Sequence, residues 1–210
     1  MSDKKDRRTP LAGKVIGVTG NPGAGKSAAA RLLEEKGARV ISGDSLGYEM
    51  LRSGSPVFPA LIQTFGEGIL GADGEIDRTA LGEIVFGSPE QLQRLNCIVH
   101  PPMLERIRGE IERFRASQEK GPLVVDAALL YEWGIEKWFD KIILVAAPKE
   151  IRRNRFLSLR GGEGSRFDKR EESQIPQEEK EKKADAVLYN QGDLMALRSQ
   201  IELLFDNRKD

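Results

Sequence analysis

Cysteine is almost absent from this chain of 210 residues, which carries a single one at Cys97. One thiol excludes an internal disulfide, and this usage is typical of a protein that works in a reducing compartment. We therefore expect a cytoplasmic location. A lone cysteine is more often a small buried apolar residue than a reactive group, and we predict that role for Cys97.

Long apolar runs and net charge are also missing. No stretch approaches the roughly 20 apolar residues that a membrane-spanning helix needs. The 33 basic and 33 acidic residues cancel, so no overall field attracts nucleic acid or a membrane, and we expect neither as a partner. Residues 1–13 are rich in Lys, Arg and Asp and lack the apolar segment of a secretion signal, so we expect a solvated tail there.

Histidine is nearly absent as well. His100 is the only one in the chain, and without a second histidine or a cysteine cluster we expect no zinc-type metal site. His100 precedes Pro101 and Pro102, where the sequence predicts the start of a helix. Two interpretations stay open: the side chain fixes the entry of that helix, or it contacts a substrate.

What the chain does have is the pattern G-x-x-x-x-G-K-S, directly after the apolar run Val15–Thr19. Glycines let backbone N–H groups converge on an anion, Lys26 can reach the terminal phosphates, and the Ser27 hydroxyl can hold a magnesium ion. A strong helix pattern follows and ends before Gly37. The pattern predicts a bound nucleoside triphosphate. The residues predicted to contact it are Gly20, Asn21, Pro22, Gly23, Ala24, Gly25, Lys26 and Ser27.

Five short apolar runs predict the strands of one sheet. They are Lys14–Thr19, Ala38–Ser42, Leu123–Asp126, Lys141–Val145 and Ala186–Tyr189. Three of them are near-continuous rather than alternating, as in strands that helices cover on both faces, and the connections are long enough for helical crossovers. The sequence therefore predicts an α/β fold in three layers with a five-stranded parallel sheet.

Two long connections interrupt this core, which comprises residues 14–45, 120–156 and 184–210. Residues 46–119 predict a helical insertion that binds the substrate, because Gly and Pro separate several helical patterns. These patterns are Gly47–Arg52, Val57–Phe65, Arg78–Phe86, Pro89–Val99 and Pro102–Ser117. Residues 157–183 include an irregular, glycine-rich and highly charged segment. We expect a mobile lid over phosphates there; the alternative is an exposed loop without function.

Phosphoryl transfer needs an aligned acceptor, neutralised charge and exclusion of water. Asp44 follows the second strand, at the carboxyl edge where open α/β sheets bind ligands. It can accept the proton of an attacking hydroxyl there; the alternative is a cap for a helix that starts near Leu46. Asp126 ends the third strand, where an acid can position magnesium through water or simply make a hydrogen bond at the strand end.

Two arginines are candidates for the triphosphate. Arg155 and Arg160 lie near the end of a helical stretch that leads into the predicted lid. The planar guanidinium suits this role because it binds phosphate through two parallel hydrogen bonds. Four more arginines lie nearby in sequence and can substitute for them, namely Arg152, Arg153, Arg166 and Arg170.

Together these motifs resemble the dephospho-coenzyme A kinase family from Lys14 to Phe205. The matching segments are Gly17–Ser27, Val40–Asp44, Leu95–Pro101, Asp126–Glu132, Gln174–Lys180 and Ala184–Gly192. The resemblance implies a P-loop kinase fold with a nucleotide-binding core, a helical substrate domain and a lid. It also implies transfer of the ATP γ-phosphoryl group to the ribose 3′-hydroxyl of dephospho-coenzyme A, with Mg²⁺ as cofactor. We expect a monomer or a weak homo-oligomer.

The resemblance further implies roles for single residues. Asp44 falls on the catalytic acid, Lys26 and Ser27 on the phosphate and magnesium contacts, and Arg155 on the arginine before the lid. Asn190 lies in the segment near the adenine. Substrate contacts are implied at Asp44, His100, Leu130 and Glu132.

Three positions depart from the family's usual pattern. Ser42-Gly-Asp44 stands where the family usually has Asp-Ala-Asp, Tyr48 where it usually has Arg, and Ala128 where it usually has Pro. The loss of a cation near the substrate phosphates, or of a proline that sets a turn, can weaken or shift acceptor binding. We expect phosphoryl transfer itself to be retained.

Other functions stay open at this point. A different P-loop small-molecule or nucleotide kinase would share the loop, the sheet and the lid. A GTPase is disfavoured, because Asn190-Gln-Gly-Asp193 lacks the lysine of a guanine-binding Asn-Lys-x-Asp pattern and no Asp-x-x-Gly switch follows the third strand. A non-catalytic nucleotide-binding regulator is disfavoured by the intact Lys26, Ser27 and Asp44.

Overall fold

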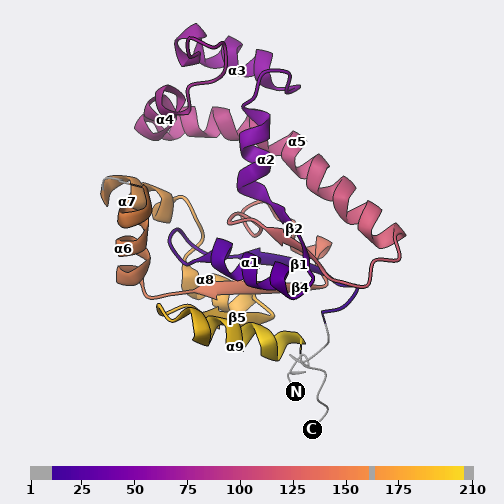
Figure 1. Cartoon of the computed structure of the whole chain (residues 1–210). Helices are drawn as coiled ribbons and strands as arrows, with labels where there is room; N and C mark the ends of the chain where they lie inside the picture. The colour runs from indigo at the N-terminus through magenta and orange to yellow at the C-terminus, as the bar shows by residue number, and fades with distance from the viewer. Residues whose placement is uncertain (1–10, 161–163, 206–210) are drawn as a thin grey trace. The chain divides into compact units, whose positions relative to one another are not determined.

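The computed structural model describes residues 11–160 and 164–205, without the side chains of residues 159 and 160. Residues 42–110 form one compact unit, and residues 11–41 together with the described residues from 111 onward form the other. The larger unit is an α/β core and the smaller one is helical (Figure 1). The smaller unit covers most of the predicted insertion, residues 46–119, but begins and ends earlier along the chain.

A five-stranded parallel sheet forms the centre of the larger unit. Its strands are β1 (Val15–Thr19), β2 (Arg39–Ser42), β3 (Leu123–Asp126), β4 (Lys141–Ala146) and β5 (Ala186–Tyr189). They lie in the order β2-β3-β1-β4-β5, so β1, which leads into the glycine-rich loop, occupies the middle. Val18 of β1 lies opposite Asp126 on one side and Ile143 on the other. The predicted α/β class and parallel sheet are confirmed.

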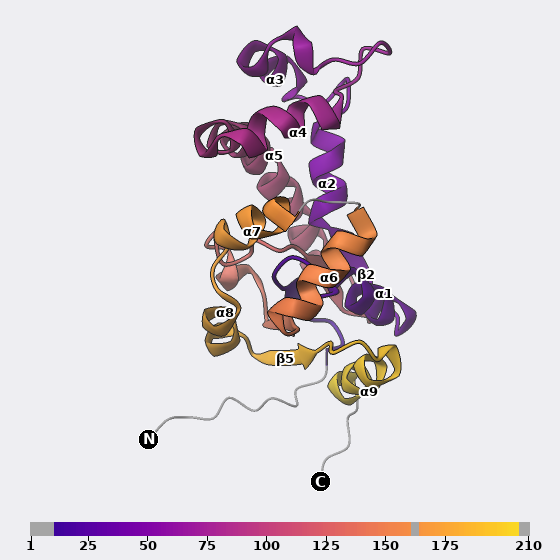
Figure 2. The same cartoon turned by 90° about the vertical axis from the view of Figure 1, so that its left-hand side faces the viewer.

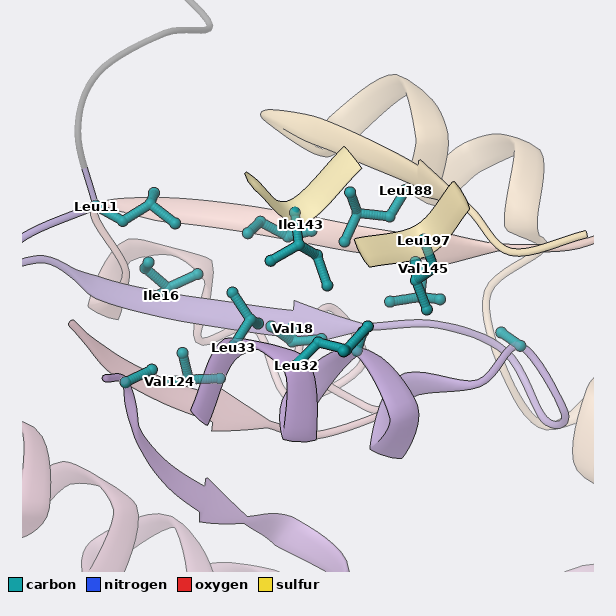
Figure 3. Close-up of a cluster of buried hydrophobic side chains, with 14 residues drawn as sticks. Leu11, Ile16, Val18, Leu32, Leu33, Val124, Ile143, Val145, Leu188 and Leu197 are labelled. Atoms are coloured by element: carbon teal, nitrogen blue, oxygen red, sulfur yellow. The ribbon is translucent and has the colours of Figure 1, made fainter. Parts of the chain in front are cut away.

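The main core lies on one face of this sheet, under helices α1 (Lys26–Glu35) and α9 (Leu194–Phe205) (Figure 3). Alternate strand residues point to this face, because successive side chains of a strand point to opposite sides. The cluster includes Ile16, Val18, Leu32, Leu33, Val124, Ile143, Val145, Leu188 and Leu197. This packing fixes α1, and with it the end of the glycine-rich loop, against the strands that flank β1.

Leu11 also belongs to this cluster and is 1% exposed. The prediction of a solvated tail over residues 1–13 is therefore wrong at Leu11, because burying an apolar side chain is favourable by about 25 cal/mol per Å². The backbone is also held there, since Lys14 N donates to Leu11 O at 3.1 Å and Gly13 N donates to Lys120 O at 3.2 Å. Residues 1–10 lie outside the described residues.

Close packing also marks the opposite face of the sheet. A Cβ on Gly17 of β1 would lie 2.7 Å from Leu130 Cδ1 and 3.1 Å from the Phe139 ring, so any side chain here would displace these two packed side chains. Leu130 itself is fully buried. Helix α8 (Gln177–Lys183) contacts β4, and the short helix η2 (Glu136–Trp138) precedes that strand.

The smaller unit consists of α2 (Gly43–Met50), α3 (Phe58–Phe65), η1 (Glu67–Ile69), α4 (Arg78–Gly87) and most of α5 (Pro89–Ala116). Its buried apolar residues include Leu61, Ile69, Leu81 and Val85. Asp77 caps α4, because its Oδ1 accepts from Thr79 N at 2.8 Å and Ala80 N at 3.3 Å.

Among the described residues, no helix combines the length and apolar character that a membrane crossing requires.

Helix α5 contradicts the prediction of two helices, Pro89–Val99 and Pro102–Ser117. It runs unbroken through Pro101 and Pro102, although a proline inside a helix removes a hydrogen bond and costs about 3 kcal/mol. The helix carries one continuous buried stripe, whose burial offsets this cost. The stripe comprises Val99, Met103, Ile107, Ile111 and Phe114.

The buried stripe of α5 also explains why the prediction for Cys97 was wrong. Cys97 is exposed. It precedes Val99 by two positions, which corresponds to about 200° around an α-helix. The thiol therefore faces away from the apolar stripe.

The charged segment predicted to be irregular is largely helical in the residues that the structure describes. Helix α6 (Lys149–Arg160) is followed by α7 (Gly164–Glu172), and the two lie side by side (Figure 2). Phe167 of α7 is fully buried, and its ring meets Phe156 of α6 edge-on with 5.6 Å between the centroids. This aromatic contact accounts for the error, because charge and glycine content hid a single anchoring side chain.

Candidate active site

The loop between β1 and α1 has glycine where a side chain cannot fit. Gly23 has a φ of 76°, and a Cβ there would lie 2.1 Å from the carbonyl oxygen of Arg152. Gly25 has a φ of 94°, and its Cβ would lie 2.1 Å from Asn190 Nδ2. Helix α1 begins directly afterwards at Lys26, so its unsatisfied N–H groups and positive dipole end adjoin the loop. This arrangement suits a bound phosphate.

Asn190 and Arg155 hold this loop from the side of β5 and α6. Asn190 Nδ2 donates to Ala24 O at 2.9 Å, and its backbone N donates to Ala146 O at 2.8 Å. Both terminal nitrogens of Arg155 donate to Asn190 O at 3.1 Å, and Nη2 also donates to Asn190 Oδ1 at 3.3 Å. The structure therefore brings two predicted ATP-site residues together beside Gly25. The side chain of Arg160, another predicted ATP contact, lies outside the described residues.

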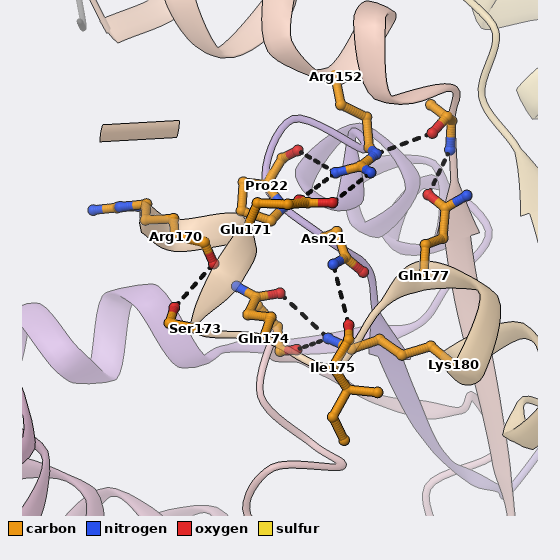
Figure 4. Close-up of polar contacts among 12 residues, drawn as sticks. Asn21, Pro22, Arg152, Arg170, Glu171, Ser173, Gln174, Ile175, Gln177 and Lys180 are labelled. Atoms are coloured by element: carbon orange, nitrogen blue, oxygen red, sulfur yellow. Dashed lines mark hydrogen bonds and ion pairs between the residues drawn. The ribbon is translucent and has the colours of Figure 1, made fainter. Parts of the chain in front are cut away.

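Arg152 has a distinct place that the cluster of arginines in the sequence did not reveal. It is 3% exposed, and its Nε donates to Ala147 O at 3.0 Å. Its terminal nitrogens bond both carboxylate oxygens of Glu171 on α7, at 2.5 and 2.7 Å, and Nη1 donates to Pro22 O at 3.4 Å (Figure 4). The guanidinium therefore links α6, α7 and the loop, and its contacts are those of a structural residue.

Lys26 and Asp126 meet at the carboxyl ends of β1 and β3. Lys26 Nζ lies 3.4 Å from Asp126 Oδ1, and the strand register pairs Asp126 with Val18 of β1. Ser27 follows on α1 and is exposed. An ammonium, a carboxylate and a hydroxyl thus stand at one end of the sheet. Within the residues described, no group of three or more His, Cys, Asp or Glu side chains forms a metal site.

In the helical unit, Asp44 lies exposed in the first turn of α2. The cap of this helix is Ser42, whose Oγ accepts from Ser45 N at 3.2 Å. The alternative interpretation of Asp44, as the cap of a helix starting near Leu46, is therefore wrong because the helix begins at Gly43. The departure at Ser42 keeps a capping residue at this position, since serine caps a helix about as well as aspartate.

Tyr48 marks a second departure, and an arginine from elsewhere in the same unit accompanies it. The Arg78 guanidinium carbon lies 4.5 Å from the centroid of the Tyr48 ring, a cation–π geometry. Tyr48 is 48% exposed. A cation therefore still stands beside the position where the family usually has arginine.

His100 lies within α5 and not at the start of a helix, so its interpretation as a helix-entry residue is wrong. Burial lowers the pKa of His100 from its ordinary value, because desolvation disfavours the charged imidazole. The imidazole is therefore favoured in its neutral form near neutral pH. Its predicted substrate contact stays a prediction.

The depressed pKa of His100 predicts a loss of stability on mild acidification. Below the ordinary value of 6.5, the unfolded chain takes up a proton that the folded chain resists, so the free energy of unfolding falls until the folded pKa is reached. Thermal melts at about pH 7.5 and 5.5 should show a lower midpoint at the acidic pH. The difference should shrink in His100→Gln; an equal difference in both proteins would contradict the assignment.

Leu130 and Glu132, two predicted substrate contacts, both meet protein groups. Leu130 packs under Gly17 with no exposed surface, and its predicted substrate contact stays a prediction. Glu132 Oε1 accepts from Ile175 N at 2.8 Å and lies 3.0 Å from Lys180 Nζ. Lys180 is fully buried. The sequence matched it only as the end of a motif, and nothing in that pattern signalled a buried charge.

A family model described as dephospho-CoA kinase matches residues 14–196. The chain belongs to the dephospho-CoA kinase family. The dephospho-CoA kinase of Carboxydothermus hydrogenoformans is 38% identical over 187 residues, covering 89% of this chain and 90% of the relative. That of Aquifex aeolicus is 38% identical over 194 residues, covering 92% and 96%. The crystal structure of TT1252 from Thermus thermophilus has a TM-score of 0.73 and 36% identity, covering 95% of this chain and 99% of that chain.

Proposed function

We propose that this protein transfers the γ-phosphoryl group of ATP to the ribose 3′-hydroxyl of dephospho-coenzyme A, which gives coenzyme A and ADP. The match to the dephospho-CoA kinase family over residues 14–196 carries this proposal. The loop independently supports the ATP part of the proposal. Gly23 and Gly25 have no room for a side chain, and a glycine-rich loop before a helix presents backbone N–H groups to phosphate. This reaction completes coenzyme A biosynthesis, for which a cytoplasmic location is expected.

Binding of the triphosphate is the task of the larger unit. The loop amides and the start of α1 bind the phosphate oxygens, and Lys26 exchanges its contact with Asp126 for the terminal phosphates. Arg155, beside Gly25, adds a second cation. The Ser27 hydroxyl and the Asp126 carboxylate are hard oxygen ligands of the kind magnesium prefers. A magnesium ion held there, largely by phosphate and water, would neutralise negative charge on the phosphates.

Activation of the acceptor is assigned to Asp44. Its carboxylate accepts the proton of the 3′-hydroxyl as the oxygen attacks the γ-phosphorus and the bond to the β-phosphate oxygen breaks. The leaving ADP keeps the bonding electron pair. The carboxylate therefore both aligns the hydroxyl for attack and takes up its proton. Asp44 does not cap α2, because Ser42 does.

The departure at Ala128 does not by itself call for a different acceptor. The Ala128 carbonyl accepts hydrogen bonds from Thr19 Oγ1 and from Lys180 Nζ, each at 3.0 Å. These two donors hold the backbone at Ala128 in place. Tyr48 is the stronger reason to test a related kinase acceptor, because it is exposed and aromatic.

A panel of acceptors tests the proposal. ADP release by the purified protein is measured with ATP and Mg²⁺ and, in turn, dephospho-coenzyme A, nucleoside monophosphates, shikimate and pantothenate. We expect dephospho-coenzyme A alone to stimulate ADP release well above the rate with water. Stimulation by another acceptor would indicate the related-kinase alternative, and ATP binding without any stimulation would indicate a regulator. The oligomeric state, a monomer or a weak homo-oligomer, stays a prediction.

A further inference from the structure

Gly20, the first glycine of the loop, is flanked by two side chains that reach away from the loop. Thr19 precedes it and donates from Oγ1 to Ala128 O at 3.0 Å. Asn21 follows it and donates from Nδ2 to Ile175 O at 3.2 Å. Both side chains are buried. The conformation at the start of the loop therefore depends on where the acceptors at Ala128 and Ile175 are held.

Lys180 holds Ala128 directly and Ile175 indirectly, through Glu132. Its Nζ donates to Ala128 O at 3.0 Å and lies 3.0 Å from Glu132 Oε1, which also accepts from Ile175 N at 2.8 Å. A third bond goes to Gln174 Oε1 at 3.3 Å (Figure 4). An ammonium group has three N–H donors, and all three have acceptors here. The contacts form a closed ring from Thr19 through Ala128, Lys180, Glu132 and Ile175 to Asn21.

The burial of this lysine sets it apart from the other lysines on α8. Lys180 is 0% exposed, whereas Lys182 and Lys183 are exposed. Burial lowers the pKa of Lys180. The Glu132 carboxylate raises this pKa, and the charge of Lys26 lowers it. A buried ion pair is weak evidence for stability, because its desolvation cost rivals its attraction. The bonds of Lys180 and Glu132 link the segment after β3 to the α7–α8 connection and, through Thr19 and Asn21, to the loop. This arrangement indicates a role in positioning the loop rather than in stability.

We propose that Lys180 is a positioning residue that fixes the start of the phosphate-binding loop. By holding Ala128 directly and Ile175 through Glu132, it sets Thr19 and Asn21 and therefore the direction of the backbone N–H groups around Gly20. The same bonds join the loop to residues 174–180, at the base of the predicted lid. The inference rests on the proposed function only in that the loop binds ATP, and it does not depend on which acceptor is phosphorylated.

Lys180→Met tests the role, because methionine is close to lysine in length but donates no hydrogen bond. We expect the dissociation constant for ATP, measured by calorimetry without acceptor, to rise about tenfold and kcat to fall about a hundredfold, because small displacements of a positioning group have effects of this size. The KM for the acceptor should change by less than about twofold. Lys183→Met, on the exposed side of the same helix, should leave all three values unchanged.

A double variant separates positioning from stability. Lys180→Met combined with Glu132→Gln removes both charges of the ion pair, while the amide oxygen introduced by the second substitution can still accept from Ile175 N. We expect the thermal midpoint to recover towards the parent value while ATP affinity and kcat stay impaired. Full recovery of the kinetics would overturn the proposal, because Lys180 would then serve only to balance Glu132.

Asn21→Ala keeps the test decisive if the Lys180 variants do not fold. This substitution removes the hydrogen bond from Asn21 Nδ2 to Ile175 O, at the other end of the ring. The ion pair between Lys180 and Glu132 stays intact. We expect the same rise in the ATP dissociation constant and fall in kcat, with little change in the acceptor KM. ATP affinity and kcat equal to those of the parent protein would contradict a positioning ring. Absence of activity with every acceptor, at unchanged ATP affinity, would instead count against the proposed function.

Discussion

Replacing Asp44 with Asn should reduce turnover by about 10²- to 10⁴-fold, the range that a positioned general base contributes. Asparagine has nearly the same shape but cannot take up the hydroxyl proton at neutral pH. The fold of α2 should be unaffected, because Ser42 and not Asp44 caps that helix. The dissociation constant for ATP should also be unchanged. Steady-state kinetics with dephospho-coenzyme A and a calorimetric titration with ATP measure the two quantities.

Glu49→Gln is the matched control for Asp44→Asn. Glu49 is another exposed acid on α2, so its substitution removes the same charge from the same helix. Its kcat should stay within about twofold of the parent value. Normal turnover in Asp44→Asn would remove Asp44 from catalysis, and a large effect in Glu49→Gln would show that the charge of the helix matters rather than one carboxylate.

Replacing Gly23 with Ala should abolish tight ATP binding. The new Cβ would lie 2.1 Å from the backbone oxygen of Arg152, and the φ of 76° adds a strain of about 1–2 kcal/mol for a residue with a side chain. The loop must move to relieve the clash, so its amides no longer converge on the phosphates. We expect the ATP dissociation constant to rise at least about a hundredfold.

Gly37→Ala separates the clash from the backbone strain. Gly37 has a φ of 90°, similar to that of Gly23, but an added Cβ would meet nothing within 4 Å. This variant should lose about 1–2 kcal/mol of stability and keep its ATP affinity. Equal losses of ATP affinity in both variants would show that strain alone, and not the fit of the loop against Arg152, governs binding.

The strands of this protein could be predicted closely from the sequence, whereas parts of its helices could not. Buried parallel strands are short continuous apolar runs between turn signals, so their ends are sharp in the sequence. Helix α5 was divided wrongly because Pro101 and Pro102 carry a local signal to stop, which tertiary burial of Val99 and Met103 overrides. Phe167 was missed for a related reason, since one buried ring in a charged segment has no periodic pattern.

The candidate site could be predicted where its chemistry lies next to a strand end. The loop, Lys26 and Asp126 follow from one motif and the register of two strands. The ion pairs that hold the loop in place could not be predicted, because each joins residues far apart in the chain. Arg152 meets Glu171 and Lys180 meets Glu132, and a sequence rich in charge offers many such pairs. Only the folded core decides which of them are buried.

Identification of the product tests the central claim most directly. The purified protein is incubated with dephospho-coenzyme A, ATP and Mg²⁺, and the acceptor is then analysed by mass spectrometry and phosphorus NMR. We predict one added phosphoryl group, located on the ribose 3′-oxygen, formed in equal amount to ADP. Unmodified dephospho-coenzyme A, or a phosphoryl group at another oxygen, would contradict the account.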